Sequence, residues 1–504
     1  MGVNCLIFSG NSDISVYHNM FKLPIKQLSA GAYRIATELR NKGYSVQVVD
    51  LAHEKKFGSI HELILKKFVD KDTLWIGFSV NFLNHLLGYP YVPTKNKLDY
   101  LKEQNSQLDL HIRSFVDYAR SLNSKVQFLI GGTRLIDLSH LGFYEFRGYA
   151  DSLILEFTDK LCRGDIPKKR IYDYEIYDNF VKSKIDYQKN DILDYYKGLS
   201  IEISRGCIFR CKFCAHPLNG KTKGEWIKRS EVLYDEFISN YEKYGIKDYV
   251  FADDTYNDSP IKLEELYNNV FSKLPFKINF VTYLRLDLLH RYPHTVDILK
   301  ESGLKAAFFG IETLNNKAAK IIGKGLDPIK QIDFASSLKQ NQFKNINMAA
   351  SWIYGLPTET KESLINMTKW ILSNENPFDS NSVGELAIRP REFNTYQVFK
   401  SPFEDDIYNY DFELFHDDEN NLEWRYRGTN LTSNWCRDLV QNLRPLEYLK
   451  RKRMNTFYLP DCITLGISEN DFTRLSPHEI AKKYNTQKLL DEINIKYIKN
   501  IAAL

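Results

Sequence analysis

The sequence lacks the features that would mark a membrane, secreted or repetitive protein. Its apolar runs fall well short of the roughly 18–20 residues that a membrane-spanning helix needs, so we expect no membrane partner. The start, MGVNCLIFSGNSD, lacks the basic flank and long apolar core of a signal peptide, and we expect a cytoplasmic protein. Neither sign of charge dominates: 68 Lys and Arg stand against 64 Asp and Glu. A net charge of +4 is small for 504 residues, so we do not expect nucleic acid as a partner.

Cysteine is scarce and unevenly placed. Seven cysteines is an odd number, which argues against a disulfide framework, and three of them, Cys207, Cys211 and Cys214, lie within eight residues. This crowding predicts metal or redox chemistry in a reducing compartment. The isolated Cys436 and Cys462 are more typical of small, buried apolar residues.

Short apolar segments alternate with amphipathic helices in the first part of the chain. Strands are predicted near residues 5–8, 46–49, 74–79 and 126–130, and a polar stretch at 84–105 is predicted to be an insertion or loop. This alternation predicts an α/β domain over residues 1–160 with a doubly wound, Rossmann-like parallel sheet. Residues 161–197 show no clear period and are predicted to be a linker.

A second βα series follows, over residues 198–400. Strands are predicted at residues 199–204, 248–252, 277–283, 305–310, 346–353 and 383–388. Helices are signalled by Ser259-Pro260 and Thr360 at their starts and by Gly303 at an end. Six such units predict a partial (β/α)6 TIM-type barrel with its active site at the carboxyl ends of the strands. Residues 401–504 are predicted to form a small, mainly helical extension and are a candidate substrate-binding region; the basic run 450–453 is interpreted as a solvated charged face.

The three clustered cysteines follow the first strand predicted for the barrel. Thiolates are the soft ligands that iron–sulfur clusters require, and three of them on one loop can bind one face of a cluster. Three ligands leave one iron open for reaction chemistry. The alternative is a zinc-stabilised binding protein in which a fourth ligand, such as His216, completes a structural site.

The segment from Cys207 to Cys214 resembles the CxxxCxxC signature of radical S-adenosylmethionine (SAM) enzymes, including the aromatic Phe213. Four later segments are similar, in order, to the family's FxDDxF, R-x-D, GIES and G-x-P-x-E-T motifs: residues 249–256, 283–287, 308–313 and 352–360. The resemblance covers about residues 199–400. It implies a 4Fe-4S cluster whose open iron binds SAM and whose electron cleaves SAM to a 5′-deoxyadenosyl radical.

The same resemblance implies which residues contact SAM: Phe213, Asp253, Asp254, Arg285, Glu312, Gly355 and Pro357. The two aspartates would accept hydrogen bonds from the SAM ammonium group. Arg285 would pair with the carboxylate, Glu312 would accept from the ribose, and Gly355 would let the backbone approach adenine. The alternatives are that the two aspartates are capping residues, that Arg285 and Glu312 are solvated strand-end charges, and that the segment with Gly355 and Pro357 is an ordinary strand–helix turn.

The first domain resembles the cobalamin-binding domain that precedes the radical SAM barrel in many methyltransferases and ring-forming enzymes. The similar segments are residues 28–50, 76–80, 129–132 and 148–151. The resemblance implies that Ser79, Gly131 and Gly132 line the pocket for the corrin and its nucleotide tail. The DxHxxG loop is absent, as in many radical SAM members that bind cobalamin without a histidine ligand. The alternative is a domain that has lost its cofactor and only supports the barrel.

Together these features predict a radical SAM enzyme, foremost a cobalamin-dependent methyltransferase acting on an unactivated carbon. A second hypothesis keeps the radical step but ends in ring closure, rearrangement or oxidation. A methylthiotransferase-like enzyme that modifies tRNA fits less well, because the first domain offers only Cys5 and Cys162 where such enzymes carry three further cysteines. We expect a small-molecule or peptide substrate and an electron donor such as flavodoxin or ferredoxin.

Overall fold

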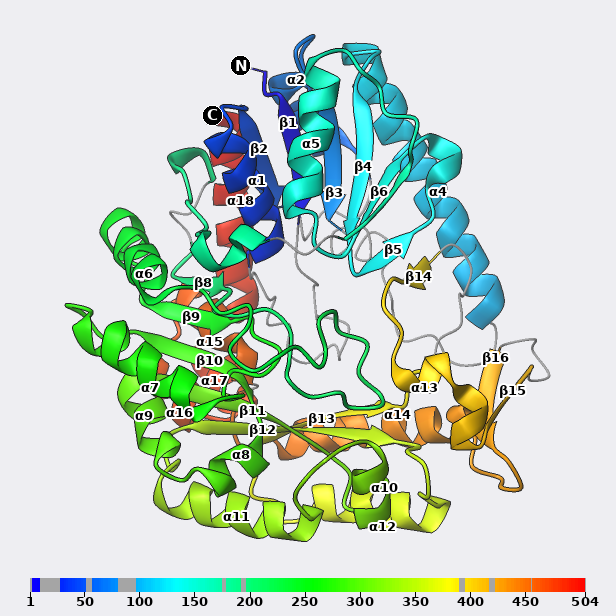
Figure 1. The fold of residues 1–504 in the computed structure, drawn as a ribbon, viewed down its shortest axis with the longest axis vertical. Helices are drawn as coiled ribbons and strands as arrows, with labels where there is room; N and C mark the ends of the chain where they lie inside the picture. Colours follow the sequence, from blue (N-terminus) through cyan, green and yellow to red (C-terminus); the bar gives the residue numbers. More distant parts are fainter. Residues whose placement is uncertain are drawn as a thin grey trace.

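Two six-stranded parallel sheets form the framework of the protein. The computed structural model describes residues 2–9, 28–50, 57–79, 97–174, 178–191, 196–388, 395–416, 422–454 and 456–503. In Figure 1 the first sheet lies at the top and the second at the bottom.

The first sheet has the strand order β2-β1-β3-β4-β6-β7. Its strands are β1 (Cys5–Ser9), β2 (Val46–Asp50), β3 (Trp75–Ser79), β4 (Gln127–Gly132), β6 (Tyr144–Arg147) and β7 (Ile171–Asp173). The helices α1 (Ala30–Asn41), α2 (Ser59–Phe68), α4 (Lys97–Leu122) and α5 (Asp151–Cys162) connect them. This confirms the doubly wound sheet. Residues 97–105 of the stretch expected to be a loop belong to α4, residues 84–96 lie outside the described residues, and β7 falls within the stretch predicted to link the domains.

The second sheet is a partial barrel, as predicted, with its six strands in sequential order and β8 and β13 at its open edges. Its strands are β8 (Gly198–Ile201), β9 (Asp248–Phe251), β10 (Asn279–Leu284), β11 (Leu304–Glu312), β12 (Asn347–Tyr354) and β13 (Ser380–Glu385). The helices between them are α6 (Ser230–Tyr244), α7 (Pro260–Asn269), α8 (Leu286–Arg291), α9 (Thr295–Ser302), α10 (Asn316–Ile321), α11 (Pro328–Asn341) and α12 (Lys361–Ile371).

The helix signals in the sequence act as predicted. The Ser259 side chain caps α7 and Pro260 is its first residue, while the Thr360 side chain accepts from the Ser363 N–H at the start of α12. Gly303 ends α9 with a φ of +108°. β13 begins three residues earlier than predicted, at the polar Ser380. Its neighbour Asn381 is held there by the Trp352 indole N–H at 2.9 Å, a contact that a propensity argument cannot see.

The extension after the barrel is mainly helical, as predicted, and includes one hairpin. It contains α13 (Pro402–Asp405), β15 (Phe412–His416), β16 (Leu422–Tyr426), α14 (Ser433–Lys450), α15 (Leu459–Thr464), α16 (Glu469–Arg474), α17 (Pro477–Lys483) and α18 (Thr486–Ala503). Apolar residues between Met454 and Ile480 pack on Val250, Val281 and Ala306 of the barrel sheet. The extension therefore supplies an inner layer of the barrel. Gly198 permits this close packing, because a Cβ there would lie 2.3 Å from the Cβ of Pro460.

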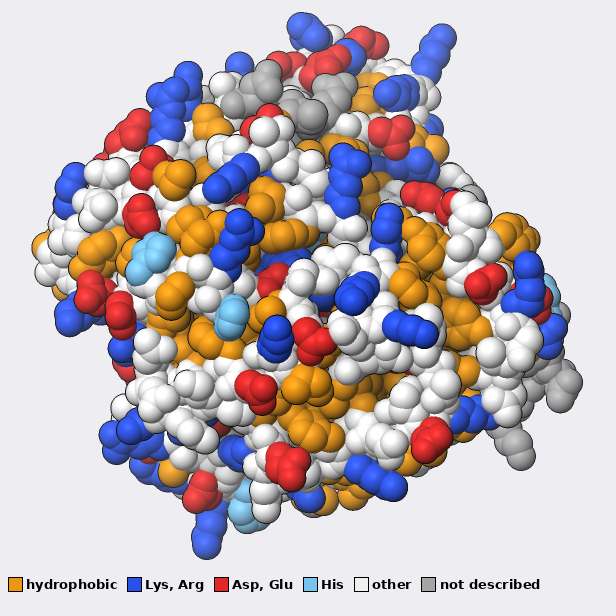
Figure 2. Space-filling model, turned by 60° about the horizontal axis from the view of Figure 1, so that its bottom comes forward, with side chains coloured by type: hydrophobic (Ala, Val, Ile, Leu, Met, Phe, Trp, Pro, Cys, Tyr) orange, Lys and Arg blue, Asp and Glu red, His pale blue; other side chains and the backbone are white. Residues whose placement is uncertain are grey.

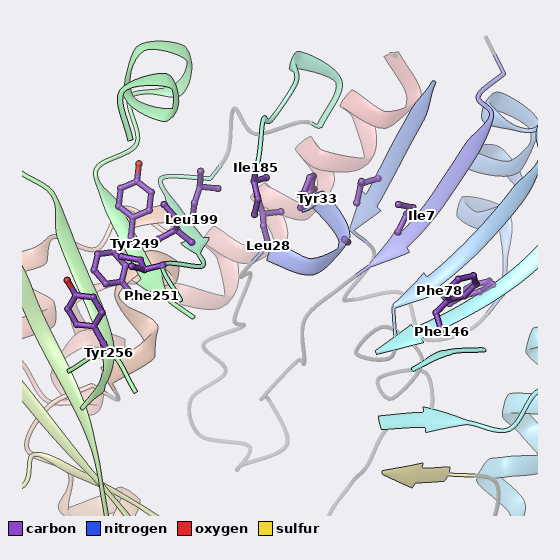
Figure 3. Packing of buried hydrophobic residues seen from close by; sticks show 14 of the residues in the cluster. Ile7, Leu28, Tyr33, Phe78, Phe146, Ile185, Leu199, Tyr249, Phe251 and Tyr256 are labelled. Atoms are coloured by element: carbon purple, nitrogen blue, oxygen red, sulfur yellow. The ribbon is translucent and has the colours of Figure 1, made fainter. Parts of the chain in front are cut away.

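Two connections tie the halves of the molecule together. Strand β5 (Arg134–Ile136) pairs antiparallel with β14 (Thr395–Gln397), and α18 returns to the first domain, where Lys67 Nζ donates to the Ala502 carbonyl at 2.9 Å. The apolar core is continuous across both sheets. Figure 3 shows the first-sheet residues Ile7, Phe78 and Phe146, the barrel residues Leu199, Tyr249, Phe251 and Tyr256, and Leu28, Tyr33 and Ile185 between them.

The charged surface has no dominant sign. On the face shown in Figure 2, basic and acidic side chains are interspersed with apolar ones. The basic run 450–453 was predicted to be a solvated face. Two of its lysines also bind the connection between α12 and β13: Lys450 donates to the Leu372 carbonyl and Lys452 to the Asn376 carbonyl. No helix among the described residues is both long and apolar enough to span a membrane.

Candidate active site

The loop after β8 carries the three clustered cysteines, and its own backbone fixes its shape. Gly206 has a φ of +74°, and a Cβ there would lie 2.5 Å from that of Leu218. The Gly220 N–H donates to the Cys207 carbonyl at 2.7 Å, which folds the loop back on itself. The Cys214 N–H donates to the Cys211 carbonyl at 3.0 Å and closes a turn between the second and third cysteines.

Each thiol has a partner from a different part of the barrel. The Cys207 thiol donates to Thr255 Oγ1 at 3.3 Å, and Asn219 Nδ2 donates to the Cys214 sulfur at 3.1 Å. Arg285 Nη1 lies 3.8 Å from the Cys211 sulfur. Donors close to sulfur are the groups that tune an iron–sulfur cluster.

The donor set fits a 4Fe-4S cluster, since it consists of three soft thiols on one loop. Among the described residues, no three Cys, His, Asp or Glu side chains are already converged as metal ligands. Burial raises the pKa of Cys207 and raises that of Cys214 to about 11, so cluster assembly has to displace their protons. His216 Nδ1 lies 3.5 Å from Asp254 Oδ1, and the structure thus directs this side chain to a carboxylate, not to the thiols.

Asp253 braces the cysteine loop. Its Oδ1 accepts from the N–H groups of Ile203 and Ser204 at 2.9 and 3.1 Å, and its Oδ2 accepts from Ser204 Oγ at 2.6 Å. Lys262 Nζ lies 3.7 Å from the same carboxylate, which is 1% exposed. Both oxygens are engaged by protein, so Asp253 binds the start of the cysteine loop, not the loop or helix that follows it.

Asp254 lies on the side of the barrel that faces the cysteine loop. Its side chain is 21% exposed and faces His216. Burial raises its pKa, although the neighbouring His216 opposes the shift. Asp254 thus keeps an accessible carboxylate oxygen where Asp253 does not.

Arg285 connects the end of β10 to the cysteine loop. Its guanidinium binds Asp287 through Nε at 3.0 Å and Nη2 at 2.6 Å and stacks over the Phe209 ring at 3.7 Å. Burial would lower its pKa, but Asp287 outweighs this and the pKa is raised, so the charge is permanent. The remaining Nη1 is the group near Cys211.

Lys324 contacts both Glu312 and the ring of Phe213. Glu312 has a φ of +74°, at a bulge between β11 and β12. Its carboxylate accepts from Lys324 Nζ at 3.3 Å and from Ser351 Oγ at 3.0 Å. Lys324 Nζ also lies 5.9 Å above the Phe213 ring. The structure thus brings two of the residues implied as SAM contacts together through a lysine.

The turn after β12 is covered by the extension. Gly355 has a φ of +93°, and a Cβ there would lie 2.3 Å from the Trp424 ring. Tyr426 Oη donates to the Gly355 carbonyl at 2.8 Å, and Glu359 accepts from the Gly355 N–H at 3.0 Å. Pro357 is buried in the same turn. The missing side chain of Gly355 therefore leaves the space that the indole ring of Trp424 occupies.

A cavity of about 530 Å³ opens at the carboxyl edge of the first sheet. It is lined by Ile7 of β1, Ser79 of β3, Gly131 and Gly132 of β4, and Gly31 at the start of α1. The strand order changes direction between β1 and β3, and ligands of doubly wound sheets bind at such a switch point. The structure therefore brings together the three residues implied as cobalamin contacts.

The far wall of this cavity includes Glu202 and Arg205, which precede Cys207. Arg205 binds Asp151 of α5 at 2.8 and 3.1 Å and Glu202 at 3.1 Å. Its guanidinium lies between the rings of Tyr149 and Phe180, at 4.2 and 4.4 Å. The sequence analysis did not predict this contact between the first domain and the cysteine loop. The only sign of it in the sequence is that two charged residues, Glu202 and Arg205, come shortly before Cys207.

Comparison with known proteins identifies the barrel. Residues 201–371 match the Radical SAM superfamily. These residues form a radical SAM domain. Members of this superfamily use a 4Fe-4S cluster and SAM, which agrees with the chemistry of the cysteine loop.

Two curated relatives are methyltransferases by name. An uncharacterized methyltransferase of Pyrococcus horikoshii is 30% identical over 179 residues, which are 34% of this chain and 37% of that protein. The hopanoid C-2 methylase of Rhodopseudomonas palustris is 23% identical over 324 residues, 62% of this chain and 57% of that protein. The chain thus spans less than two thirds of the length of either relative.

Two solved structures share the fold. The radical SAM methyltransferase TsrM from Kitasatospora setae, with cobalamin and a 4Fe-4S cluster bound, matches with a TM-score of 0.61 and 14% identity over 98% of this chain and 100% of that one. The cobalamin-dependent radical SAM enzyme OxsB matches with a TM-score of 0.53 and 17% identity over 74% of this chain and 52% of that one. The order of sheet, radical SAM domain and extension is therefore one that other proteins use.

Proposed function

We propose that this protein is a radical SAM enzyme that binds cobalamin in its first domain and methylates an unactivated carbon. The observation that supports this most directly is the cavity of about 530 Å³ whose wall, Glu202 and Arg205, belongs to the cysteine loop. A domain kept only to support the barrel would gain from filling this space, because open cavities forgo packing energy. Bound in these sites, the cluster and SAM would supply a 5′-deoxyadenosyl radical and the cobalamin would supply a methyl group.

The side chains of this chain divide the work of binding. Cys207, Cys211 and Cys214 would hold three irons, and Asp254 would accept from the SAM ammonium group through its accessible oxygen. Arg285, whose Nη1 lies near Cys211, would pair with the SAM carboxylate, and Glu312 would accept from the ribose hydroxyls of SAM. In this scheme residues 1–160 hold cobalamin, residues 198–400 hold the cluster and SAM, and residues 401–504 close the barrel.

The partners follow from the same chemistry. A radical SAM reaction needs an electron donor, for which we propose a flavodoxin or ferredoxin, and a small-molecule or peptide substrate. The names of two similar proteins, a hopanoid methylase and TsrM, support methyl transfer as the outcome.

The cavity can be blocked without disturbing the core. Gly31 lines it, and a Cβ added there meets no atom within 4 Å, so Gly31→Trp places an indole in the cavity. Asn41→Trp is the matched control, since Asn41 is exposed at the far end of the same helix. Reconstituted anaerobically, the wild type and control should bind cobalamin with a corrinoid absorbance, whereas Gly31→Trp should keep its iron–sulfur absorbance and lose the corrinoid.

The products then identify the reaction. With substrate, methyl transfer should release both 5′-deoxyadenosine and S-adenosylhomocysteine. Release of 5′-deoxyadenosine alone would instead indicate ring closure, rearrangement or oxidation. Stoichiometric zinc with no iron would end the enzyme hypothesis, and equal cobalamin binding by Gly31→Trp would end the proposed use of the cavity.

A further inference from the structure

The inner face of the barrel sheet has a filled layer and an open layer. Val250, Val281 and Ala306 are buried under the extension, at 6%, 0% and 0% exposure. Side chains two residues apart on a strand share a face, so Tyr283 and Phe308 form the next layer toward the carboxyl ends. Tyr283 is 42% exposed and Phe308 is half-buried. The extension therefore covers the first layer fully and the second layer only in part.

Three rings meet in this second layer. Phe457, from the 3-10 helix Thr456–Tyr458 of the extension, lies 4.5 Å from the Tyr283 ring and 5.6 Å from the Phe308 ring. The Tyr283 and Phe308 rings lie 5.2 Å apart at 68°. We call Tyr283, Phe308 and Phe457 the aromatic floor. Arg285, which is proposed to bind SAM, follows Tyr283 by two residues. The aromatic floor therefore lies next to the site proposed for SAM.

The other described groups around this space are small or already paired. Ser351 and Ser382 are register partners on β12 and β13, and Ser382 is exposed. The charged groups at the strand ends have ion partners: Asp254 has His216, Arg285 has Asp287 and Glu312 has Lys324. Among the residues that the structure describes, none of these groups is left to act as a counter-ion, so a charged substrate group placed on the floor would lose its hydration without compensation from them.

We propose that the aromatic floor binds the substrate, and that the part of the substrate resting on it is an uncharged, apolar, ring-containing skeleton. A flat or alicyclic ring packs on aromatic faces over a large area, and stacking adds to the burial of that area. The carbon that reacts would then lie between the floor and the residues proposed to hold SAM. This inference names the substrate class of the proposed enzyme, and it rests on the proposed function.

Binding can be tested before the substrate is known. The probe is naphthol, an uncharged double ring, and naphthoate is its charged counterpart; saturation-transfer NMR detects both on the reconstituted protein with SAM under anaerobic conditions. We expect naphthol to bind wild type, and naphthoate to bind about tenfold more weakly or worse. Phe457→Ala with Tyr283→Ala should weaken naphthol binding about tenfold or more, whereas Tyr283→Phe keeps the ring and should bind as wild type does.

Two further variants separate the floor from general packing. Phe457→Leu keeps an apolar side chain and the fold but removes the ring, and should weaken naphthol binding severalfold. Tyr458→Ala removes the adjacent ring of the same short helix and should leave naphthol binding unchanged. No binding to wild type, equal binding of naphthoate, or unchanged binding in the double variant would overturn the inference. Naphthol binding needs no SAM cleavage, so a protein that binds naphthol but never forms 5′-deoxyadenosine would refute the proposed function and leave the floor as a binding site.

Discussion

Replacing Asp253 by asparagine distinguishes a brace from a SAM ligand. The carboxylate accepts three hydrogen bonds, from Ile203 N at 2.9 Å, Ser204 N at 3.1 Å and Ser204 Oγ at 2.6 Å, and it lies 3.7 Å from Lys262 Nζ. An amide removes the negative charge and turns an NH2 group toward one of these donors. Lys262 keeps Asp258 at 2.6 Å, so its charge is not left unpaired. We expect Asp253→Asn to lower the free energy of unfolding by about 3 kcal/mol, the lower end of the range for breaking a buried ionic contact.

The assay is urea unfolding of the protein before reconstitution, followed by iron content and SAM affinity after it. Ser204→Ala tests the coupling: in the Asp253→Asn protein it should cost clearly less than in wild type. Asp254→Asn is the matched control, expected to change stability by less than about 0.5 kcal/mol while weakening SAM binding. If Asp253→Asn unfolds as wild type does but loses SAM affinity, the bracing role is refuted and Asp253 is a SAM ligand.

Two other changes probe the domain junction and the turn after β12. Arg205→Met leaves Asp151 without its bidentate partner in a buried site, so it should cost about 3 kcal/mol in urea unfolding and weaken cobalamin binding; an unchanged corrinoid spectrum and stability would contradict the link. Although burial alone would raise it, Arg205 and Arg34 hold the pKa of Glu202 well below its usual range, so Glu202 stays charged in this network. Burial raises the pKa of Glu359 to about 7, so the folded state holds this proton after the unfolded state has released it, and stability should fall as pH rises from about 4.5 to about 7. Glu359→Gln should flatten that part of a melting-temperature profile, and an equally steep profile would show that another group is responsible.

The sequence was sufficient where local pattern determines structure. Alternating apolar strands and helix caps such as Ser259-Pro260 are short-range signals, and they placed both sheets. The cysteine spacing likewise placed the three thiols on one loop. β13 was predicted three residues late because Ser380 and Asn381 have low strand propensity, and partners far along the chain hold them in the sheet.

The site residues whose roles depend on distant contacts could not be assigned from the sequence. Asp253 and Asp254 are adjacent and chemically identical, yet one is enclosed by the backbone of residues 203–204 and the other faces His216. Gly355 was interpreted as a point where the backbone can approach adenine, and nothing in the sequence indicated that Trp424 lies against it. Neither outcome follows from a motif, because each depends on which segment from elsewhere in the chain fills the adjacent space.

The inner layer that Met454 to Ile480 give to the barrel also sets an order on biosynthesis. All six barrel strands leave the ribosome before these residues exist, so the nascent sheet exposes Val250, Val281 and Ala306 to water until translation has passed them. The cysteine loop follows β8, the first strand of this sheet. We therefore expect residues 198–400 expressed alone to expose this apolar lining and to aggregate.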